Sequence, residues 1–289
     1  MFFQQIANGL ILGSQYTLIA LGLTMIYGIL GIINFAHGEL FMIGAFVGYT
    51  LTIVYNLNFF LALLLSMFIM AVIGIVIEMV FIKPLRNLPV TSTIIGTIGV
   101  SIFLLNGAIL IFGPDPKRFL TPYVNKAVNI AGVAITQQRL FVFFISIILI
   151  VLLGQFIKKT KLGKAMRATS QNYEAANLMG IDIDYIAKIT LVIGSALAGA
   201  AGTLIGPIFL VYPQMSIPAI TKAFVVVILG GLGNVEGAIF SGFILGITES
   251  LTAGYFSSYY KDIVAFLMLI LILLFKPEGI FGKHIIEKV

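Results

Sequence analysis

The stretch GILGIINFAHGELFMIGAF, Gly28 to Phe46, sets an amide, an imidazole and a carboxylate between apolar runs long enough for lipid. An isolated carboxylate at the centre of a bilayer costs about 2.5–3.5 kcal/mol on insertion scales. We therefore expect Glu39 to lie at an interface, to pair with Asn34 and His37, or to line a wet cavity. The alternative is a helix break held by local hydrogen bonds, with Glu39 capping a helix that begins near Gly38.

The apolar character on both sides of this stretch extends through the whole chain. Of the 289 residues, 60% are hydrophobic and 10% are charged, and the mean hydropathy is +1.12. Soluble domains are nearer 45–50% apolar and about 25% charged. Because one core cannot bury this surplus, the composition predicts an all-α polytopic membrane bundle that forms a single domain over residues 1–289.

Division of the chain into runs of about 20 apolar residues predicts eight or nine transmembrane helices. The expected spans are Ile6–Ile29, Leu40–Leu57, Phe60–Ile82, Ser92–Phe112, Leu140–Ile157, Ile189–Val211, Ala223–Leu232, Ala238–Tyr255 and Ile263–Phe275. The seventh run is short and meets glycines at 230, 231, 233 and 237, which predict a helix break or a re-entrant element.

Basic residues in three places predict the orientation, although the loop 113–139 also carries Lys117, Arg118, Lys126 and Arg139 and weakens the argument. The three places are 83–89, 158–188 and the tail, with Lys276, Lys283 and Lys288. Since cytoplasmic loops carry an excess of Lys and Arg, all three are expected on the cytoplasmic side. That arrangement requires nine crossings, with the N-terminus outside. Eight crossings plus a re-entrant segment would place the tail outside, and the loop 113–139 is expected outside in either case.

The residues for catalysis or for a resident cofactor are missing from the sequence. There is no cysteine, and the two histidines, His37 and His284, lie in different regions, so a metal site is not expected. The chain has no GxxxxGK[ST] phosphate loop. We therefore expect a protein that is not an enzyme and binds no cofactor.

The cytoplasmic stretch 158–188 contains the sequence NYEAANLMGI, from Asn172 to Ile181. Asn172 to Met179 can form a short helix, and Gly180 is well placed to end it in the left-handed conformation. Such a helix is too short to be stable alone. Because it exposes Leu178 and Met179, it is typical of a segment that docks in the groove of a partner.

This motif resembles the EAA loop of ABC importer permeases, in which a coupling helix fits a cleft of the ATPase. Together with GILGIINFAHGELFMIGAF, LVIGSALAGAAGTLIG (191–206) and VVVILGGLGNVEGAIFSGFILGI (225–247), it resembles the permeases of branched-chain amino-acid ABC importers, specifically the LivH type. The resemblance implies the ABC importer permease fold. It also implies coupling residues, which are Asn172, Tyr173, Glu174, Ala175, Ala176, Leu178, Met179 and Gly180.

The same resemblance implies a function and a set of partners. It predicts a bacterial inner-membrane permease that moves leucine, isoleucine and valine from an external binding protein into the cytoplasm. The expected partners are a second permease and two ATPase chains, which would bind ATP and Mg. An ABC permease for another small polar solute, such as urea or an amide, is the alternative. A secondary transporter, with intramembrane charge pairs and no exposed coupling helix, is a third reading.

The translocation path is harder to read from the sequence. The candidates are Asn34, His37, Glu39, Asn106 and Glu249, with Tyr16 as a weaker one. We expect Lys222 to extend toward water. The small residues Gly194, Ala198 and Gly202, spaced four apart, allow close helix approach, either within this chain or with another subunit.

Overall fold

The computed structural model describes residues 1–86, 88–119, 127–130 and 132–282, and these ranges are almost entirely helical. The helices are α1 (Phe2–Leu30), α2 (His37–Tyr49), α3 (Phe59–Ile77), α4 (Lys83–Leu85), α5 (Val90–Phe112), α6 (Gln137–Lys159), α7 (Lys161–Gln171), α8 (Tyr173–Leu178), α9 (Ile183–Ile205), α10 (Ser216–Gly230), α11 (Val235–Tyr255) and α12 (Lys261–Phe275). Strands β1 (Ala127–Ile130) and β2 (Val133–Thr136) pair antiparallel, with Ala127 opposite Thr136.

Nine segments of the described chain are long and apolar enough to cross a bilayer, which confirms the all-α membrane class. The seventh is Pro213–Gly230, a 3₁₀ turn followed by α10. The sequence reading began this span at Ala223, because Ser216, Pro218 and Lys222 interrupt the apolar run. With the longer α10, the count agrees with the prediction of nine crossings rather than eight.

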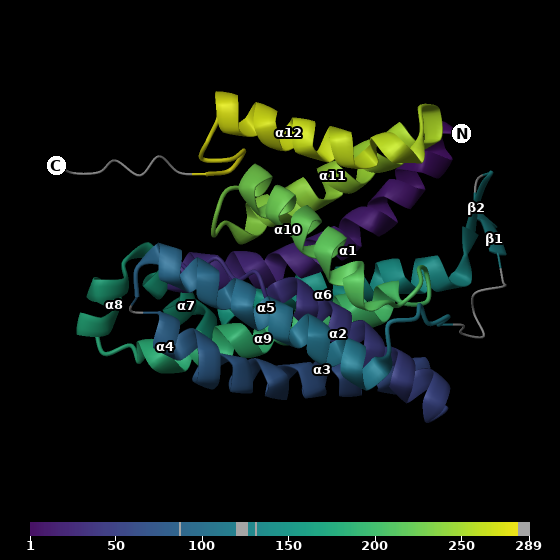
Figure 1. Cartoon of the computed structure of the whole chain (residues 1–289). Helices are drawn as coiled ribbons and strands as arrows, with labels where there is room; N and C mark the ends of the chain where they lie inside the picture. The colour runs from purple at the N-terminus through teal and green to yellow at the C-terminus, as the bar shows by residue number, and fades with distance from the viewer. Residues whose placement is uncertain (87, 120–126, 131, 283–289) are drawn as a thin grey trace.

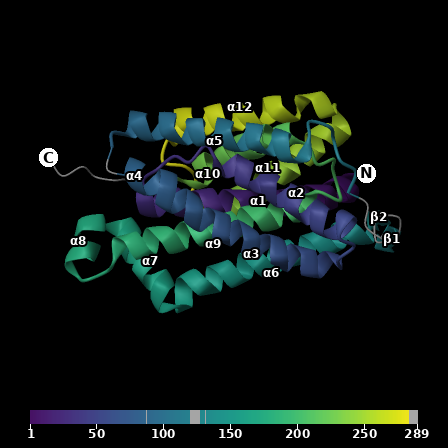
Figure 2. The ribbon, with the colours of Figure 1, turned by 60° about the horizontal axis from the view of Figure 1, so that its bottom comes forward.

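The bundle has two distinct ends (Figure 1). Helices α4, α7 and α8 lie at one, here called the α8 end, and the N-terminus and the β1–β2 hairpin lie at the other, the hairpin end; Figure 2 shows the same separation. The basic stretches 83–89 and 158–188 therefore share one end, as their charge predicted. Ile280 N–H donates to Leu229 O at 2.8 Å, so the chain after α12 also returns to the end of α10. Lys283 and Lys288 lie outside the described residues.

Helix α1 runs through the centre of the bundle and packs on α9, α10 and α11, while α9 also packs on α2 and α3. A small polar network joins three of these helices. The Thr203 hydroxyl donates to Gly44 O at 2.9 Å, and the Ser66 hydroxyl donates to the same carbonyl at 3.2 Å. Such bonds between helices satisfy polar groups that have no access to water in a bilayer.

The small-residue stripe of α9 is used inside the chain. Gly194 lies against Gly22 and Ile26 of α1, and a Cβ at Gly202 would collide with the backbone of Phe41 in α2. Ala198 is completely buried. Of the two readings that the sequence left open, the structure selects packing within one chain.

Two irregular segments, 31–36 and 206–212, bring the next helix start into the middle of the bundle. His37, at the start of α2, contacts Ile19 O through Nε2 at 3.1 Å, and Ile19 lies about 16 Å along α1 from its last residue, Leu30. Gly38 in turn lies against Ser216 O, at the start of α10. The N-termini of α2 and α10 therefore meet deep within the protein, where irregular backbone at membrane depth is tolerated.

The glycine cluster forms a tight turn between α10 and α11 instead of a break within a span. Gly231 and Gly233 have φ angles of 100° and 78°, which favour glycine, and Gly230 and Gly237 approach so closely that a Cβ on either would meet the other's backbone. The prediction of a helix break at these glycines holds only in that sense. The re-entrant backbone beside α10 precedes that helix, at 206–212.

Candidate translocation cavity and coupling helix

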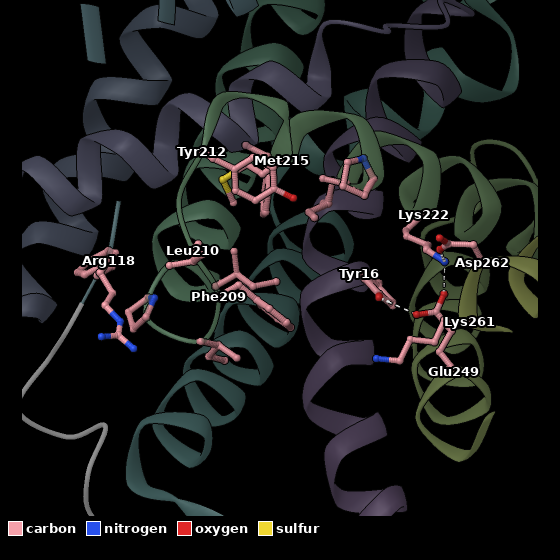
Figure 3. A pocket seen from close by; sticks show the side chains of 18 residues that line it. Tyr16, Arg118, Phe209, Leu210, Tyr212, Met215, Lys222, Glu249, Lys261 and Asp262 are labelled. Atoms are coloured by element: carbon pink, nitrogen blue, oxygen red, sulfur yellow. Dashed lines mark hydrogen bonds and ion pairs between the residues drawn. The ribbon is translucent and has the colours of Figure 1, made fainter. Parts of the chain in front are cut away.

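A cavity of about 680 Å³ lies among α1, α2, segment 206–212, α10, α11 and the start of α12 (Figure 3). Its lining is mainly apolar, with Ile19, Phe41, Ile208 and Met215 among the contributors. Segment 206–212 covers one side and is held by backbone hydrogen bonds between Val211 and Lys117 at 2.7 and 3.0 Å. A concave, mainly apolar space with a few polar groups is the usual form of a small-molecule site.

One wall of the cavity carries a cluster of charged groups. Lys222 Nζ lies 2.5 Å from Glu249 Oε1 and 2.7 Å from Asp262 Oδ1, and the Tyr16 hydroxyl donates to Glu249 Oε2 at 2.8 Å (Figure 3). Glu249 is 1% exposed and Lys222 is 7% exposed. Lys222 was expected to reach water; the structure instead buries its ammonium group between two carboxylates.

The polar residues of the stretch from Gly28 to Phe46 lie outside the lining of the cavity. Asn34, His37 and Glu39 are all buried, and none of them lines the cavity. The Asn34 side chain accepts a hydrogen bond from Ala36 N–H at 3.1 Å. This bond is local, whereas the contact between His37 and Ile19 O joins the start of α2 to the middle of α1. The capping role expected of Glu39 stays a prediction.

Some polar atoms at this break have no hydrogen-bond partner among the described residues. They are Asn34 Nδ2, His37 Nδ1 and Glu39 Oε2. The other side of the Glu39 carboxyl group interacts with Ser101 and Ser216, so this group links the start of α2 to α5 and α10. Among the described residues no hydrogen bond joins Glu39 to Asn34 or His37, so the expected pairing is not seen, and their part in a path stays a prediction.

The two remaining candidates for the path, Glu249 and Asn106, lie in different environments. Glu249 lines the cavity, whereas Asn106 lies on the exposed surface of α5, where its amide donates to Ile102 O at 2.8 Å. Sequence reading did not single out Asp262 and Lys261, which also line the cavity. A signal was present, because Lys222 and Glu249 are opposite charges within successive spans and an isolated one would be costly there.

The short helix that the sequence predicts between Asn172 and Met179 is α8, Tyr173–Leu178. Asn172 caps it by accepting a hydrogen bond from Ala175 N–H at 2.9 Å, and Gly180 follows its end with a φ of 83°. Ala176 is the buried residue of the helix, whereas Leu178 and Met179 are 87% and 83% exposed. Tyr173, Glu174 and Ala175 are also exposed, so this helix presents most of its surface outward.

Helix α8 is tied directly to the transmembrane core. Asp182 caps α9 by accepting from Tyr185 N–H at 3.0 Å, only a few residues after α8 ends. Asp184, in the first turn of α9, pairs with Arg86 and lies 2.9 Å from Lys83 Nζ. The first turn of α9, close to α8, is therefore joined to α4 and to Arg86 directly after it.

A multi-pass helical bundle with a mainly apolar, partly charged cavity and a projecting short helix is typical of membrane transport subunits. A family described as "Branched-chain amino acid transport system / permease component" matches residues 5–273. The chain belongs to this family.

Individual relatives agree with that assignment. The chain is 39% identical over 303 residues to the high-affinity branched-chain amino acid transport system permease protein BraD of Pseudomonas aeruginosa, covering 100% of this chain and 98% of BraD. It is 38% identical over 301 residues to LivH of Escherichia coli (strain K12), with the same coverage. The permease protein LivM of that organism is 25% identical over 291 residues, covering 92% of this chain and 67% of LivM.

Proposed function

We propose that this chain is the permease subunit of an ATP-driven importer that carries branched-chain amino acids across a bacterial inner membrane. The single observation that carries the coupling to ATP is α8, a capped two-turn helix with exposed Leu178 and Met179 beside the core. An exposed apolar helix face of this size fits a groove on a partner. The family membership supplies the solute class.

The cavity suits this solute class. An aliphatic amino acid needs an apolar space for its side chain and opposite charges for its zwitterionic end. The cavity offers Ile19, Phe41 and Met215 for the first and the charged cluster around Lys222 for the second. We place the α8 end in the cytoplasm, which orients the hairpin end toward an external binding protein.

The proposed assembly contains a second homologous permease, two ATPase chains that bind ATP and Mg, and the binding protein. The existence of two named permease types among the relatives, LivH and LivM, supports a pair of different permeases. Closure of the ATPase pair would pull α8 and, through the Asp182 cap and the Asp184 ion pairs, shift α9 against α2 and α3. Since α2 contributes Phe41 to the cavity, that shift would change access to it.

A transporter that works without ATPases is the second candidate, because the Lys222–Glu249–Asp262 cluster is the intramembrane charge group that such a protein would need. The exposed α8 favours the ATP-driven reading. The two candidates differ in their energy source, and one experiment separates them.

That experiment measures L-leucine uptake into proteoliposomes that contain the purified complex, with and without ATP. We expect uptake only with ATP and the loaded binding protein. Leu178→Asp should abolish uptake while the complex remains in the membrane, because a charge replaces the apolar docking residue. Ser170→Asp, on the exposed face of neighbouring α7, is the matched control and should leave uptake unchanged. Leucine uptake that persists without ATPase chains would establish the second candidate.

A further inference from the structure

The charged cluster on the cavity wall contains one more carboxylate than its central lysine requires. Lys222 Nζ bridges Glu249 and Asp262, at 2.5 and 2.7 Å. Both Glu249 oxygens are engaged, one by Lys222 and the other by the Tyr16 hydroxyl. Glu249 alone is therefore enough to balance the charge of Lys222 in this buried position.

Asp262 differs from Glu249 in exposure and attachment. Its side chain is 73% exposed, whereas that of Glu249 is 1% exposed. It lies in the first turn of α12, a helix of which Ala265 is the buried residue. Water competes for a carboxylate that is this exposed, which weakens its ion pair. Asp262 is thus the member of the cluster that can leave Lys222 at little cost.

We propose that the Lys222–Asp262 pair is the binding site for the zwitterionic end of the transported amino acid. The ligand's carboxylate displaces the Asp262 carboxylate from Lys222 Nζ, and the released Asp262 pairs with the ligand's ammonium group. The exchange replaces one ion pair by two and leaves the net charge of the cavity unchanged. Glu249, held by Tyr16, keeps Lys222 charged and in position throughout. This inference rests on the proposed function, whose substrate site it names.

The apolar lining completes the site. With its charged end at Lys222, a ligand has its side chain among the apolar lining residues, which include Ile19, Phe41, Ile208 and Met215. A volume of about 680 Å³ accommodates an amino acid and several waters, since one water occupies about 30 Å³ in the liquid. The charge pair selects for zwitterions, and the lining selects for aliphatic side chains.

The natural absence of cysteine allows a direct binding test. Phe209 lines the cavity and is half exposed, so Phe209→Cys gives the one thiol of this chain, and the other chains of the purified complex are used in cysteine-free form. The measurement is the rate at which a cationic methanethiosulfonate labels this thiol. We expect L-leucine to slow labelling about tenfold. Leucinamide lacks the carboxylate and 4-methylpentanoate lacks the ammonium group, so neither should protect. Tyr259→Cys, exposed and outside the cavity lining, is the matched control and should be labelled equally with or without leucine.

The role of Asp262 is tested in the same background. Asp262→Asn should raise the leucine concentration that gives half protection about tenfold, because a charge-assisted contact is lost, and Asp262→Glu should restore it. This exposed position is unlike Lys222, whose replacement could disturb folding. Absent protection by leucine, equal protection by 4-methylpentanoate, or an unchanged value for Asp262→Asn would each overturn the inference. If a complex that imports leucine with ATP gives one of these results, the proposed function stands and only the site assignment fails.

Discussion

Gly44 illustrates how little space the core leaves at the level of single residues. A Cβ at this position would collide with the backbone of Gly199, so α2 and α9 are in direct backbone contact. The same residue provides the carbonyl that accepts from Thr203 and Ser66. In a bilayer, where association of helices depends on close packing and polar contacts, such a position carries more of the stability than a larger side chain would.

Gly44→Ala should therefore destabilise the protein by roughly 1–3 kcal/mol, the usual cost of overpacking. Gly107→Ala is the matched control, because a Cβ there meets nothing within 4 Å and alanine favours a helix interior. Thermal unfolding of both variants in detergent checks this, with a lower midpoint for Gly44→Ala and an equal or higher one for Gly107→Ala. Equal midpoints for Gly44→Ala and the unsubstituted protein would contradict the packing described here.

At the level of elements, the ion pairs of Asp184 with Lys83 and Arg86 form a clamp between α9 and α4. Asp184 is half exposed and pairs with Lys83 and Arg86, so it contributes little to stability but fixes the position of α9 relative to α4. Asp182 sits two residues earlier and only caps α9. Asp184 therefore joins two helices, whereas Asp182 caps one.

Asp184→Asn should lower leucine uptake per ATP hydrolysed several-fold, because movement of α8 is no longer passed through α9 to α4, while the unfolding midpoint changes by the equivalent of about 1 kcal/mol or less. Asp182→Asn should change neither quantity, since asparagine also caps helices. Coupled uptake and hydrolysis assays on both variants make the comparison. If Asp184→Asn left leucine uptake per ATP hydrolysed unchanged, the ion pairs of Asp184 would have no part in coupling.

The elements that could be predicted from the sequence are those with local signals. Asn172 and Gly180 delimit α8 by capping chemistry that depends on neighbouring residues only. The start of α10 and the irregular segment 206–212 could not be predicted from the sequence, because distant residues determine them. Gly38 lies against the start of α10, and Lys117 forms backbone hydrogen bonds with segment 206–212. Lys222 and Asp262 meet for the same reason: helix rotation about its axis is set by packing, and no local pattern records it.

At the level of the whole molecule, we place the α8 end and the hairpin end on opposite sides of the membrane. Since the chain has no cysteine, single cysteines at Met179 and at Tyr259 report each end separately. Both positions are highly exposed. In intact cells, a membrane-impermeant thiol reagent should label Tyr259→Cys and leave Met179→Cys unlabelled until the membrane is permeabilised. Labelling of both from the same side would contradict the arrangement of crossings.

We propose that α8 docks on a separate ATPase chain. A cross-link formed from this helix to that chain is the most direct evidence for the contact. A photoreactive amino acid at Met179, irradiated in membranes that contain the assembled complex, should form an adduct with an ATPase chain. The same group at Ser170 should form far less, because that residue lies on α7, outside the proposed docking surface. An adduct at Met179 that contains an ATPase chain is the predicted result; no such adduct, with the complex intact, would contradict the account.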